Sequence, residues 1–407
     1  MLHCGLLGER LGHSYSPEIH KMLADYEYRL YEKSPDELED FLTRGEWDGL
    51  NVTIPYKRAV MTYCAELSDT ARRAGSVNTL VRRPDGSIFG DNTDVWGFRC
   101  MLERSGVHIS GKKALVLGSG GASGAVRAVL EDKGADSIIT VSRCGKNNYE
   151  NAFCHPDISL IVNATPVGMF PNNGECRISV ADFPACQAVL DLVYNPARTE
   201  LLMQAEELGI KTENGLLMLV AQAKRSCELF TGREIPESET DRVLHSLRAR
   251  MRSVILIGMP GCGKTAVGER LAQLTGRTLL DSDREIVRMS GMSIQGIFAQ
   301  EGEAGFRSRE SAALAELGKM SGCIIATGGG VVTRAKNYRL LHQNGVIVWL
   351  RRDVDKLERT GRPLSVNADL DAMYDARKGL YRRFSDLEAD NNGTLDDTVK
   401  TILELIK

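Results

Sequence analysis

The middle of the chain alternates short apolar runs with helix-like patterns. The runs are strand-length and almost continuously apolar, and they lie at 114–117, 138–141, 160–162 and 188–191. A strand buried on both faces of a parallel sheet has this pattern, whereas a half-exposed strand alternates apolar and polar residues. We therefore predict a Rossmann-like parallel sheet, covered by helices, over residues 101–214.

A second alternating series begins at residue 253. Its apolar runs lie near Val254, near Leu279, at 323–325 and at 346–349. This series predicts another α/β domain with a parallel sheet over residues 253–407. The total length of 407 residues is enough for two or three domains.

The first 100 residues have shorter strand and helix signals, which predict a smaller α/β domain. Residues 216–229 have the spacing of one amphipathic helix, and the Arg-rich run 242–252 favours a short helical connector over a flexible tether. We expect residues 1–100 to be completed by helices within about 215–245, so that residues 215–252 hold the returning helices and the connector.

Charge and cysteine content narrow the range of partners. The 51 Lys and Arg residues nearly balance the 54 Asp and Glu residues, which gives no long-range field for nucleic acid or an anionic membrane. The ten cysteines include no C-x-x-C pair, and the N-terminus has no signal-like apolar segment. We expect a cytoplasmic protein with reduced thiols and small-molecule ligands, and nothing in the sequence indicates an oligomer.

The most specific motif is Gly258-Met259-Pro260-Gly261-Cys262-Gly263-Lys264-Thr265, between an apolar run and a helical pattern. A phosphate-binding loop requires this strand, loop and helix context. Lys264 is expected to reach the β- and γ-phosphates of a nucleotide, and Thr265 to bind Mg²⁺. Asp281 and Asp283 end the following strand pattern, so alternate carboxylates there can face one site, one toward the metal and one toward an acceptor hydroxyl.

A second Gly-rich loop, Gly118-Ser119-Gly120-Gly121-Ala122-Ser123-Gly124, follows a strand and opens a helix, as a pyrophosphate-binding loop does. Ser123 stands where the commonest fingerprint has its third glycine. The next strand is followed by Ser142, Arg143 and Lys146, without the carboxylate that usually binds the ribose of NAD. A basic strand end suits a 2′-phosphate, so we expect NADP.

Four polar motifs precede this loop, at 12–17, 51–57, 76–79 and 90–94. Each is compatible with ordinary turns. Together they offer the neutral hydrogen-bonding groups that a small polyhydroxylated carboxylic acid requires, and Lys57 with Asp94 can supply an acid/base pair. Asp94 either takes part directly or only holds Lys57 as its ion-pair partner, and the sequence leaves both open.

Seven motifs follow one another along the chain, and in order they are Ser-x-Ser-Pro, Asn-Val-Thr-x-Pro-x-Lys, Asn-Thr-Asp, the Gly-rich loop, Asn163-Ala164-Thr165-Pro166, Tyr194-Asn195-Pro196 and Gly215-x-x-Met218-x-x-x-Gln222. On these motifs, residues 1 to about 245 resemble shikimate dehydrogenase. The resemblance implies Lys57 as the main acid/base, with Asp94 as its partner. It implies a substrate pocket of Ser14, Ser16, Thr53, Lys57, Asn78, Asp94, Tyr194 and Gln222. The expected NADP-binding residues are Gly118, Ser119, Gly120, Gly121, Ala122, Ser142, Arg143, Lys146, Thr165, Gly215 and Met218.

From residue 253 onward, the phosphate loop and the motifs at 302–307, 327–330, 359–364 and 377–381 resemble shikimate kinase, which has a P-loop fold like that of NMP kinases. The resemblance implies catalytic roles for Lys264, Asp283 and Arg362, and Mg²⁺ binding by Thr265 and Asp281. The expected ATP-binding residues are Gly261, Cys262, Gly263, Lys264, Thr265, Ala266, Arg359 and Arg362. The expected substrate-binding residues are Asp283, Arg307, Gly328, Gly329, Gly330 and Arg377.

One departure concerns the lid of this kinase-like half. Only Thr360 and Gly361 separate Arg359 from Arg362, whereas many family members have a longer segment there. This departure concerns the coverage of the site by the lid and the role of Arg359, and it leaves the phosphate loop unaffected.

The two resemblances converge on one metabolite. They imply a bifunctional enzyme of aromatic amino acid (chorismate) biosynthesis, in which NADPH reduces 3-dehydroshikimate and Mg-ATP then phosphorylates the shikimate 3-hydroxyl. One alternative is a quinate/shikimate dehydrogenase with dual cofactor use in the first half. Another is an inactive metabolite sensor, which would be expected to lose at least one of Lys57, Lys264, Thr265 or Asp283, yet all four are present.

Overall fold

The computed structural model describes residues 1–12, 14–143, 145–358 and 369–406. The chain divides into two compact units, the first made of Met1–Tyr194 and Thr199–Ser246, and the second of Asn195–Arg198 and Leu247–Lys407. The division falls inside helix α8 (Glu237–Met251), so the connector expected at 242–252 is helical and begins earlier than the Arg-rich run. Within the described ranges, no helix combines the length and hydrophobicity needed to span a lipid bilayer.

One sheet of the first unit has six strands in the order β2-β1-β3-β5-β6-β4. Their bounds are β1 His3–Gly8, β2 Glu27–Glu32, β3 Gly49–Val52, β4 Glu66–Leu67, β5 Thr79–Arg82 and β6 Ile88–Asp91. β1 pairs in parallel with β2 and β3, whereas β5 is antiparallel to β3 and β6. Leu7, Leu50 and Leu80 are fully buried and share one core with Leu42 of the helix α2 (Leu38–Arg44).

The other sheet of this unit is parallel throughout, with the order β11-β10-β9-β7-β8. Its strands are β7 Lys113–Leu117, β8 Ser137–Val141, β9 Ile158–Asn163, β10 Ala188–Asp191 and β11 Lys211–Asn214. The predicted apolar runs are β7 to β10, and β9 is buried at every position. Nothing in the apolar pattern predicts β11, because this strand at the sheet edge is polar.

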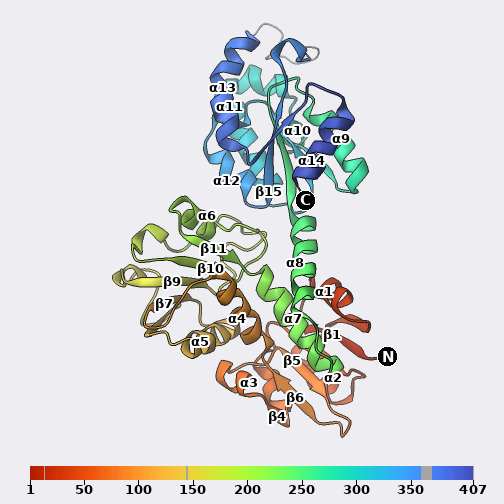
Figure 1. The fold of residues 1–407 in the computed structure, drawn as a ribbon, viewed down its shortest axis with the longest axis vertical. Coiled ribbons are helices and arrows are strands. Elements are labelled where there is room, and N and C mark those ends of the chain that lie inside the picture. The colour runs from red at the N-terminus through yellow and green to blue at the C-terminus, as the bar shows by residue number, and fades with distance from the viewer. Residues whose placement is uncertain (13, 144, 359–368, 407) are drawn as a thin grey trace. The chain divides into compact units, whose positions relative to one another are not determined.

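Helices α4 (Thr93–Ser105) and α7 (Leu216–Thr231) pack against each other in the first unit (Figure 1). Their contact is close: a Cβ on Gly97 would lie 2.6 Å from the carbonyl oxygen of Met218. Since α7 also contacts α1 and β5, the chain returns to the first sheet after completing the second. The amphipathic helix predicted at 216–229 is thereby confirmed. The other helices of this unit are α1 Ser16–Leu23, α3 Asp69–Ala74, α5 Gly121–Asp132 and α6 Glu200–Glu207.

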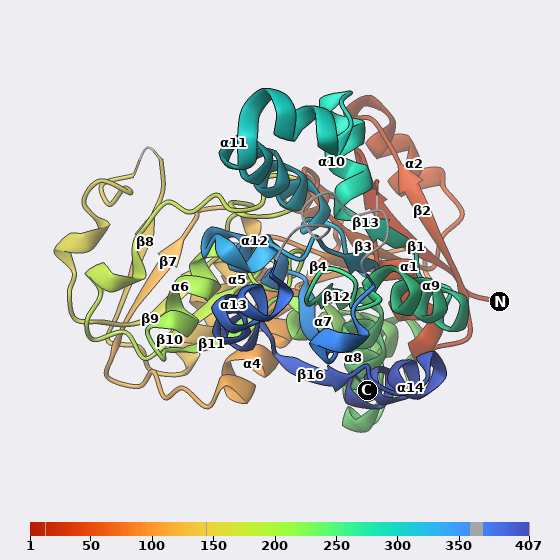
Figure 2. The same cartoon turned by 90° about the horizontal axis from the view of Figure 1, so that it is seen from above.

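The second unit has a parallel sheet in the order β13-β14-β12-β15-β16. Its strands are β12 Ser253–Ile257, β13 Leu279–Asp281, β14 Ile324–Ala326, β15 Gly345–Arg351 and β16 Leu387–Asp390. Its helices are α9 Lys264–Thr275, α10 Ser282–Ser290, α11 Ile294–Leu317, α12 Lys336–His342, α13 Leu370–Phe384 and α14 Leu395–Leu405. α9 and α14 lie side by side, on the side away from α11 (Figure 2). The three sheets confirm the predicted α/β class.

A glycine divides α11 near its middle. Gly302 has φ of 67° and ψ of −170°, a backbone conformation that residues with a Cβ rarely adopt. A second helical segment therefore starts at Glu303, and it carries Arg307 one turn from its beginning.

Candidate functional sites

Lys57 and Asp94 form an ion pair in the first unit. Lys57 follows β3 after a turn, and Asp94 lies in the first turn of α4. Lys57 Nζ lies 2.5 Å from Asp94 Oδ2, and the two side chains are only 20% and 11% exposed. A partly buried ammonium that is held by one carboxylate keeps donors available for a ligand.

This ion pair lies beside the Gly-rich loop of the second sheet. A Cβ on Gly121 would lie 3.6 Å from Lys57 Cδ and 3.7 Å from Ser76 Oγ. The Asn92 amide donates to both the carbonyl and the hydroxyl of Ser76, at 2.8 and 3.0 Å, and so fixes this neighbour. The fold thus brings the acid/base candidates of the first domain to the start of α5.

Asn51 belongs to a buried hydrogen-bond network of the first unit. Its carbonyl accepts from the Tyr28 hydroxyl at 2.8 Å, and its amide donates to Ser226 Oγ at 2.8 Å. Ser226 and Thr93 are linked at 3.1 Å. Sequence reasoning placed Asn51 in a motif but gave it no role, because its partners are far away along the chain.

The network reaches two residues of the expected substrate pocket. Asn78 Oδ1 accepts from the backbone N–H of Thr93 at 2.7 Å, and Thr93 Oγ1 donates to Gln222 Oε1 at 3.3 Å. Both Asn78 and Gln222 are buried. The core therefore fixes their orientation.

Of the remaining pocket residues, Ser14, Ser16 and Thr53 follow β1 and β3, whereas Tyr194 follows β10. Ser16 begins α1, and its N–H donates to Ser14 Oγ at 3.2 Å. Thr53 follows β3 and lies against Gly8, whose Cβ would be 2.8 Å from Thr53 Cγ2. Tyr194 makes an edge-to-face contact with Tyr15, with 6.0 Å between ring centroids, and burial raises the pKa of Tyr194.

The Gly-rich loop after β7 has the geometry of a pyrophosphate site. Gly118 has φ of +109°, and Gly120 caps α5 with open space where a Cβ would project. Backbone N–H groups there are accessible to a bound phosphate, so the loop fits a dinucleotide. A Cβ on Gly124 would clash with the carbonyl of Ala74, so this glycine lets α5 pack closely against the end of α3, and Ser123 is buried beside it.

The other NADP candidates follow neighbouring strands of the same sheet. Ser142, Arg143 and Lys146 come after β8, Thr165 after β9, and Gly215 and Met218 after β11. Ligands of parallel α/β sheets bind at these carboxyl ends. Arg143 and Lys146 are exposed, whereas Met218 is buried. The Thr165 hydroxyl donates to Asn163 Oδ1 at 2.6 Å, so it is already engaged in the turn.

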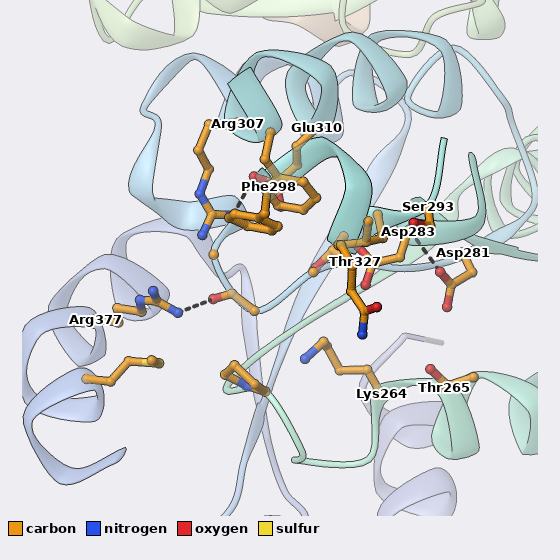
Figure 3. A pocket seen from close by; sticks show the side chains of 18 residues that line it. Lys264, Thr265, Asp281, Asp283, Ser293, Phe298, Arg307, Glu310, Thr327 and Arg377 are labelled. Atoms are coloured by element: carbon orange, nitrogen blue, oxygen red, sulfur yellow. Dashed lines mark hydrogen bonds and ion pairs between the residues drawn. The ribbon is translucent and has the colours of Figure 1, made fainter. Parts of the chain in front are cut away.

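In the second unit, a cavity of about 530 Å³ gathers most of the predicted kinase residues. Its lining includes Lys264, Thr265, Asp281, Asp283, Arg307, Gly328, Gly329, Gly330 and Arg377. Arg307 and Arg377 occupy one side, Thr265 and Asp281 the opposite side, and the amino group of Lys264 lies between them (Figure 3). Arg359 and Arg362 lie outside the residues that the structure describes.

The phosphate loop joins β12 to α9. Gly261 and Gly263 have φ of +80° and +93°, which the tight loop requires. Lys264 is buried, and Nζ donates to the carbonyls of Gly258 and Met259 at 2.9 Å each. Its ammonium is therefore held across the mouth of the loop, where a nucleotide phosphate binds.

The two carboxylates after β13 are arranged differently from the prediction. The strand ends at Asp281, and Asp283 lies in the first turn of α10. Asp281 Oδ1 accepts from the N–H groups of Asp283 and Arg284 at 2.9 and 3.1 Å, so it caps the helix. A helix turn, and not strand alternation, brings both carboxylates to the cavity. Thr265 and Asp281 offer two oxygen ligands, which fits Mg²⁺ because this ion usually takes few protein ligands beside phosphates and water.

Glu310 is a cavity residue that sequence reasoning missed. It is fully buried, and Oε2 lies 2.9 Å from Arg307 Nη1. Burial raises the pKa of Glu310, and the Arg307 guanidinium opposes that rise. The available signal was the three-residue spacing between Arg307 and Glu310 on a helix, which places them on one face.

The three consecutive glycines are closely surrounded by side chains. Cβ atoms on Gly328, Gly329 and Gly330 would lie 2.9 Å from Glu310 Oε1, 2.6 Å from Pro260 Cδ and 2.1 Å from Arg307 Nη2. The N–H of Gly328 donates to Ser282 Oγ at 2.9 Å. The N–H of Gly328 is therefore engaged by Ser282, and the absence of a Cβ at the three glycines makes room for neighbouring side chains.

Arg377 lies on α13, above the same glycines. Its Nη1 donates to the Gly329 carbonyl at 3.3 Å, and the Tyr381 hydroxyl donates to that carbonyl as well. Arg307 and Arg377 thus present two guanidinium groups to one cavity, a geometry suited to a carboxylate ligand.

A dinucleotide loop beside a Lys–Asp pair defines a nicotinamide-dependent oxidoreductase, and the second unit has the loop and sheet of a P-loop kinase. Residues 6–80 match the shikimate dehydrogenase substrate binding domain, and residues 260–407 match shikimate kinase. The shikimate dehydrogenase (NADP(+)) of Clostridium perfringens strain SM101 is 37% identical over an alignment of 268 residues, and the match covers 60% of this chain and 98% of that protein.

Solved structures of shikimate dehydrogenases also match about 60% of this chain. A chorismate mutase/shikimate 5-dehydrogenase fusion protein from Clostridium acetobutylicum is 38% identical with a TM-score of 0.57, and covers 60% of this chain and 96% of its own. The Thermus thermophilus shikimate 5-dehydrogenase, in complex with NADP(H) and shikimate, is 30% identical with a TM-score of 0.55, and covers 60% of this chain and 99% of its own.

The chain belongs to the shikimate dehydrogenase family and carries a shikimate kinase domain after it. It is a bifunctional shikimate-pathway enzyme, with NADP as the cofactor of one half and ATP with Mg²⁺ serving the other. The predicted fusion is confirmed, and the inactive-sensor alternative is set aside.

Proposed function

We propose that the first half reduces 3-dehydroshikimate to shikimate with NADPH, and that the second half transfers the γ-phosphoryl group of ATP to the 3-hydroxyl of that shikimate. The ion pair of Lys57 and Asp94 beside Gly121 carries the first assignment, and the cavity around Lys264 carries the second. We assign residues 1–100, completed from about 215–245, to the substrate domain, 101–214 to the NADP domain and 253–407 to the kinase.

In the dehydrogenase half, bound NADPH supplies hydride to the ketone carbon. Lys57 binds the ketone oxygen and donates the proton that the developing alkoxide needs. Asp94 holds the Lys57 ammonium in place at 2.5 Å. Asn78 and Gln222, fixed by the buried network, bind substrate hydroxyls, together with Ser14, Ser16 and Thr53.

In the kinase half, Thr265 and Asp281 would hold Mg²⁺, which would supply positive charge to the ATP phosphates. Lys264 stabilises negative charge on the transferring phosphoryl group. Asp283 orients the 3-hydroxyl and accepts its proton. Arg307 and Arg377 bind the shikimate carboxylate, and Glu310 keeps Arg307 in position through their 2.9 Å contact.

A single reaction mixture tests both halves. The purified chain receives 3-dehydroshikimate, NADPH, ATP and Mg²⁺, and products are followed by mass spectrometry over time. We expect shikimate first and shikimate 3-phosphate after it. Accumulation of shikimate alone contradicts the kinase assignment, and an unchanged ketone contradicts the roles of Lys57 and Asp94. Quinate with NAD, tested separately, decides whether the first half has the alternative activity.

Arg143 is expected to set the preference for NADPH. Its guanidinium is exposed after β8, where the 2′-phosphate of the cofactor would lie. Arg143→Ala should lower kcat/KM for NADPH by roughly 10- to 100-fold, since a charge-assisted contact is lost, and should leave NADH nearly unaffected. Arg127→Ala, an exposed arginine on α5, is the control. An equal loss with both cofactors contradicts the role in 2′-phosphate binding.

A further inference from the structure

The segment after β15 lies on the phosphate loop of the second unit. A Cβ on Gly261 would lie 2.3 Å from the carbonyl oxygen of Glu358, and the N–H of Glu358 donates to the Gly261 carbonyl at 3.2 Å. The same segment begins with Arg352, directly after the strand. The segment that follows β15 therefore comes back to the phosphate loop at Glu358.

The Arg352 side chain lies near Gly263, at the end of the phosphate loop that joins α9. A Cβ on Gly263 would lie 3.6 Å from Arg352 Nη1 and 3.1 Å from the amide nitrogen of Asn391. Arg352 Nε donates to the Lys356 carbonyl at 3.0 Å, which orients the guanidinium. That amide of Asn391 also donates to the Cys262 carbonyl, so the surroundings of the guanidinium are fixed.

The basic residues near Arg352 in the sequence form ion pairs with carboxylates. Arg351 lies 3.5 Å from Glu388, and Lys356 lies 3.1 Å from Asp353. Over the described part of the chain, Arg352 has no carboxylate within ion-pair distance. A half-buried guanidinium at a phosphate-binding loop, without an acidic partner, is suited to an anionic ligand.

We propose that Arg352 binds the α/β-phosphate part of the nucleotide in the kinase half. This inference rests on the proposed ATP site. The backbone at Gly263 belongs to the part of a phosphate loop that holds the α- and β-phosphates, whereas Lys264 reaches toward the γ-phosphate. Arg352 therefore contributes to nucleotide affinity more than to the transfer step. The ATP-binding arginines expected from the sequence are Arg359 and Arg362, and the sequence gave no role to Arg352.

ADP is the discriminating probe, because it retains the α- and β-phosphates and lacks the transferred group. Its binding to the full chain is measured by titration calorimetry for wild type, Arg352→Ala and Arg352→Lys. Arg351→Ala is the matched control, since Arg351 is adjacent, equally charged and paired with Glu388. Dehydrogenase activity and thermal unfolding verify that each variant is folded.

We expect Arg352→Ala to weaken ADP binding and to raise the KM for ATP by about tenfold each, with kcat within about twofold of wild type. Arg352→Lys should recover part of the affinity, because a point charge remains. ADP affinity equal to that of Arg351→Ala overturns the proposal, as does a fall in kcat with ADP binding unchanged. If the wild-type chain fails to bind ADP, the ATP site of the proposed function fails with it.

Discussion

Replacing Lys264 by methionine should lower the kinase kcat/KM by roughly a thousandfold or more and leave the dehydrogenase rate unchanged. Methionine keeps most of the length of the lysine side chain and removes the ammonium, with its charge and its hydrogen-bond donors. Because Lys264 Nζ is held by the carbonyls of Gly258 and Met259, the ammonium is already in place before nucleotide binds. Preorganised charge of this kind stabilises the transferring phosphoryl group without reorganisation.

The bifunctional chain supplies its own control for this variant. Dehydrogenase activity of the same preparation reports concentration and integrity, and shikimate 3-phosphate is measured by mass spectrometry. Lys319→Met provides a matched substitution, since Lys319 lies on the same unit and pairs with Glu316 at 2.9 Å. Kinase activity that survives Lys264→Met at the level of Lys319→Met would remove Lys264 from the mechanism.

Replacing Lys57 by methionine should lower the dehydrogenase kcat by roughly 100- to 10,000-fold, the range for a lost general acid. The kinase rate should be unchanged. The reduction needs a proton at the alkoxide oxygen, and Lys57 lies between Asp94 and the Gly-rich loop, where a nicotinamide-bearing cofactor approaches. The loss should appear in kcat more than in KM, because proton donation matters most in the transition state.

The variant leaves Asp94 without its cationic partner, so its effect needs separation from destabilisation. Lys57→Met combined with Asp94→Asn removes the unpaired carboxylate and should be equally inactive. Lys113→Met is the matched control, because Lys113 forms an exposed pair with Asp157 at 2.6 Å. Recovery of activity in the double variant would show that Lys57 acts only by neutralising Asp94.

Asp94→Asn alone separates the two roles that the sequence left open for Asp94. An asparagine still accepts a hydrogen bond from Lys57 but carries no charge. A modest loss of kcat indicates that Asp94 mainly positions Lys57, whereas a loss as large as that of Lys57→Met indicates a direct part in proton transfer. Absorbance of NADPH gives the rate in both cases.

The sequence determined what depends on residues close together along the chain. The continuous apolar runs predicted β7 to β10, because buried parallel strands need no polar face. The two glycine-rich loops revealed phosphate sites, since their spacing encodes a local backbone conformation. The order of motifs also indicated both activities before any fold was known.

The tertiary structure decided what depends on distant residues. The polar edge strand β11 exists through pairing with β10, and the apolar pattern carries no trace of that pairing. Asn51 gains its role only where Tyr28 and Ser226 meet it, and Arg352 gains its position only where its segment packs on Gly261 and Gly263. Local patterns record periodicity and turn chemistry, whereas contacts between remote segments arise from packing that no single window of sequence contains.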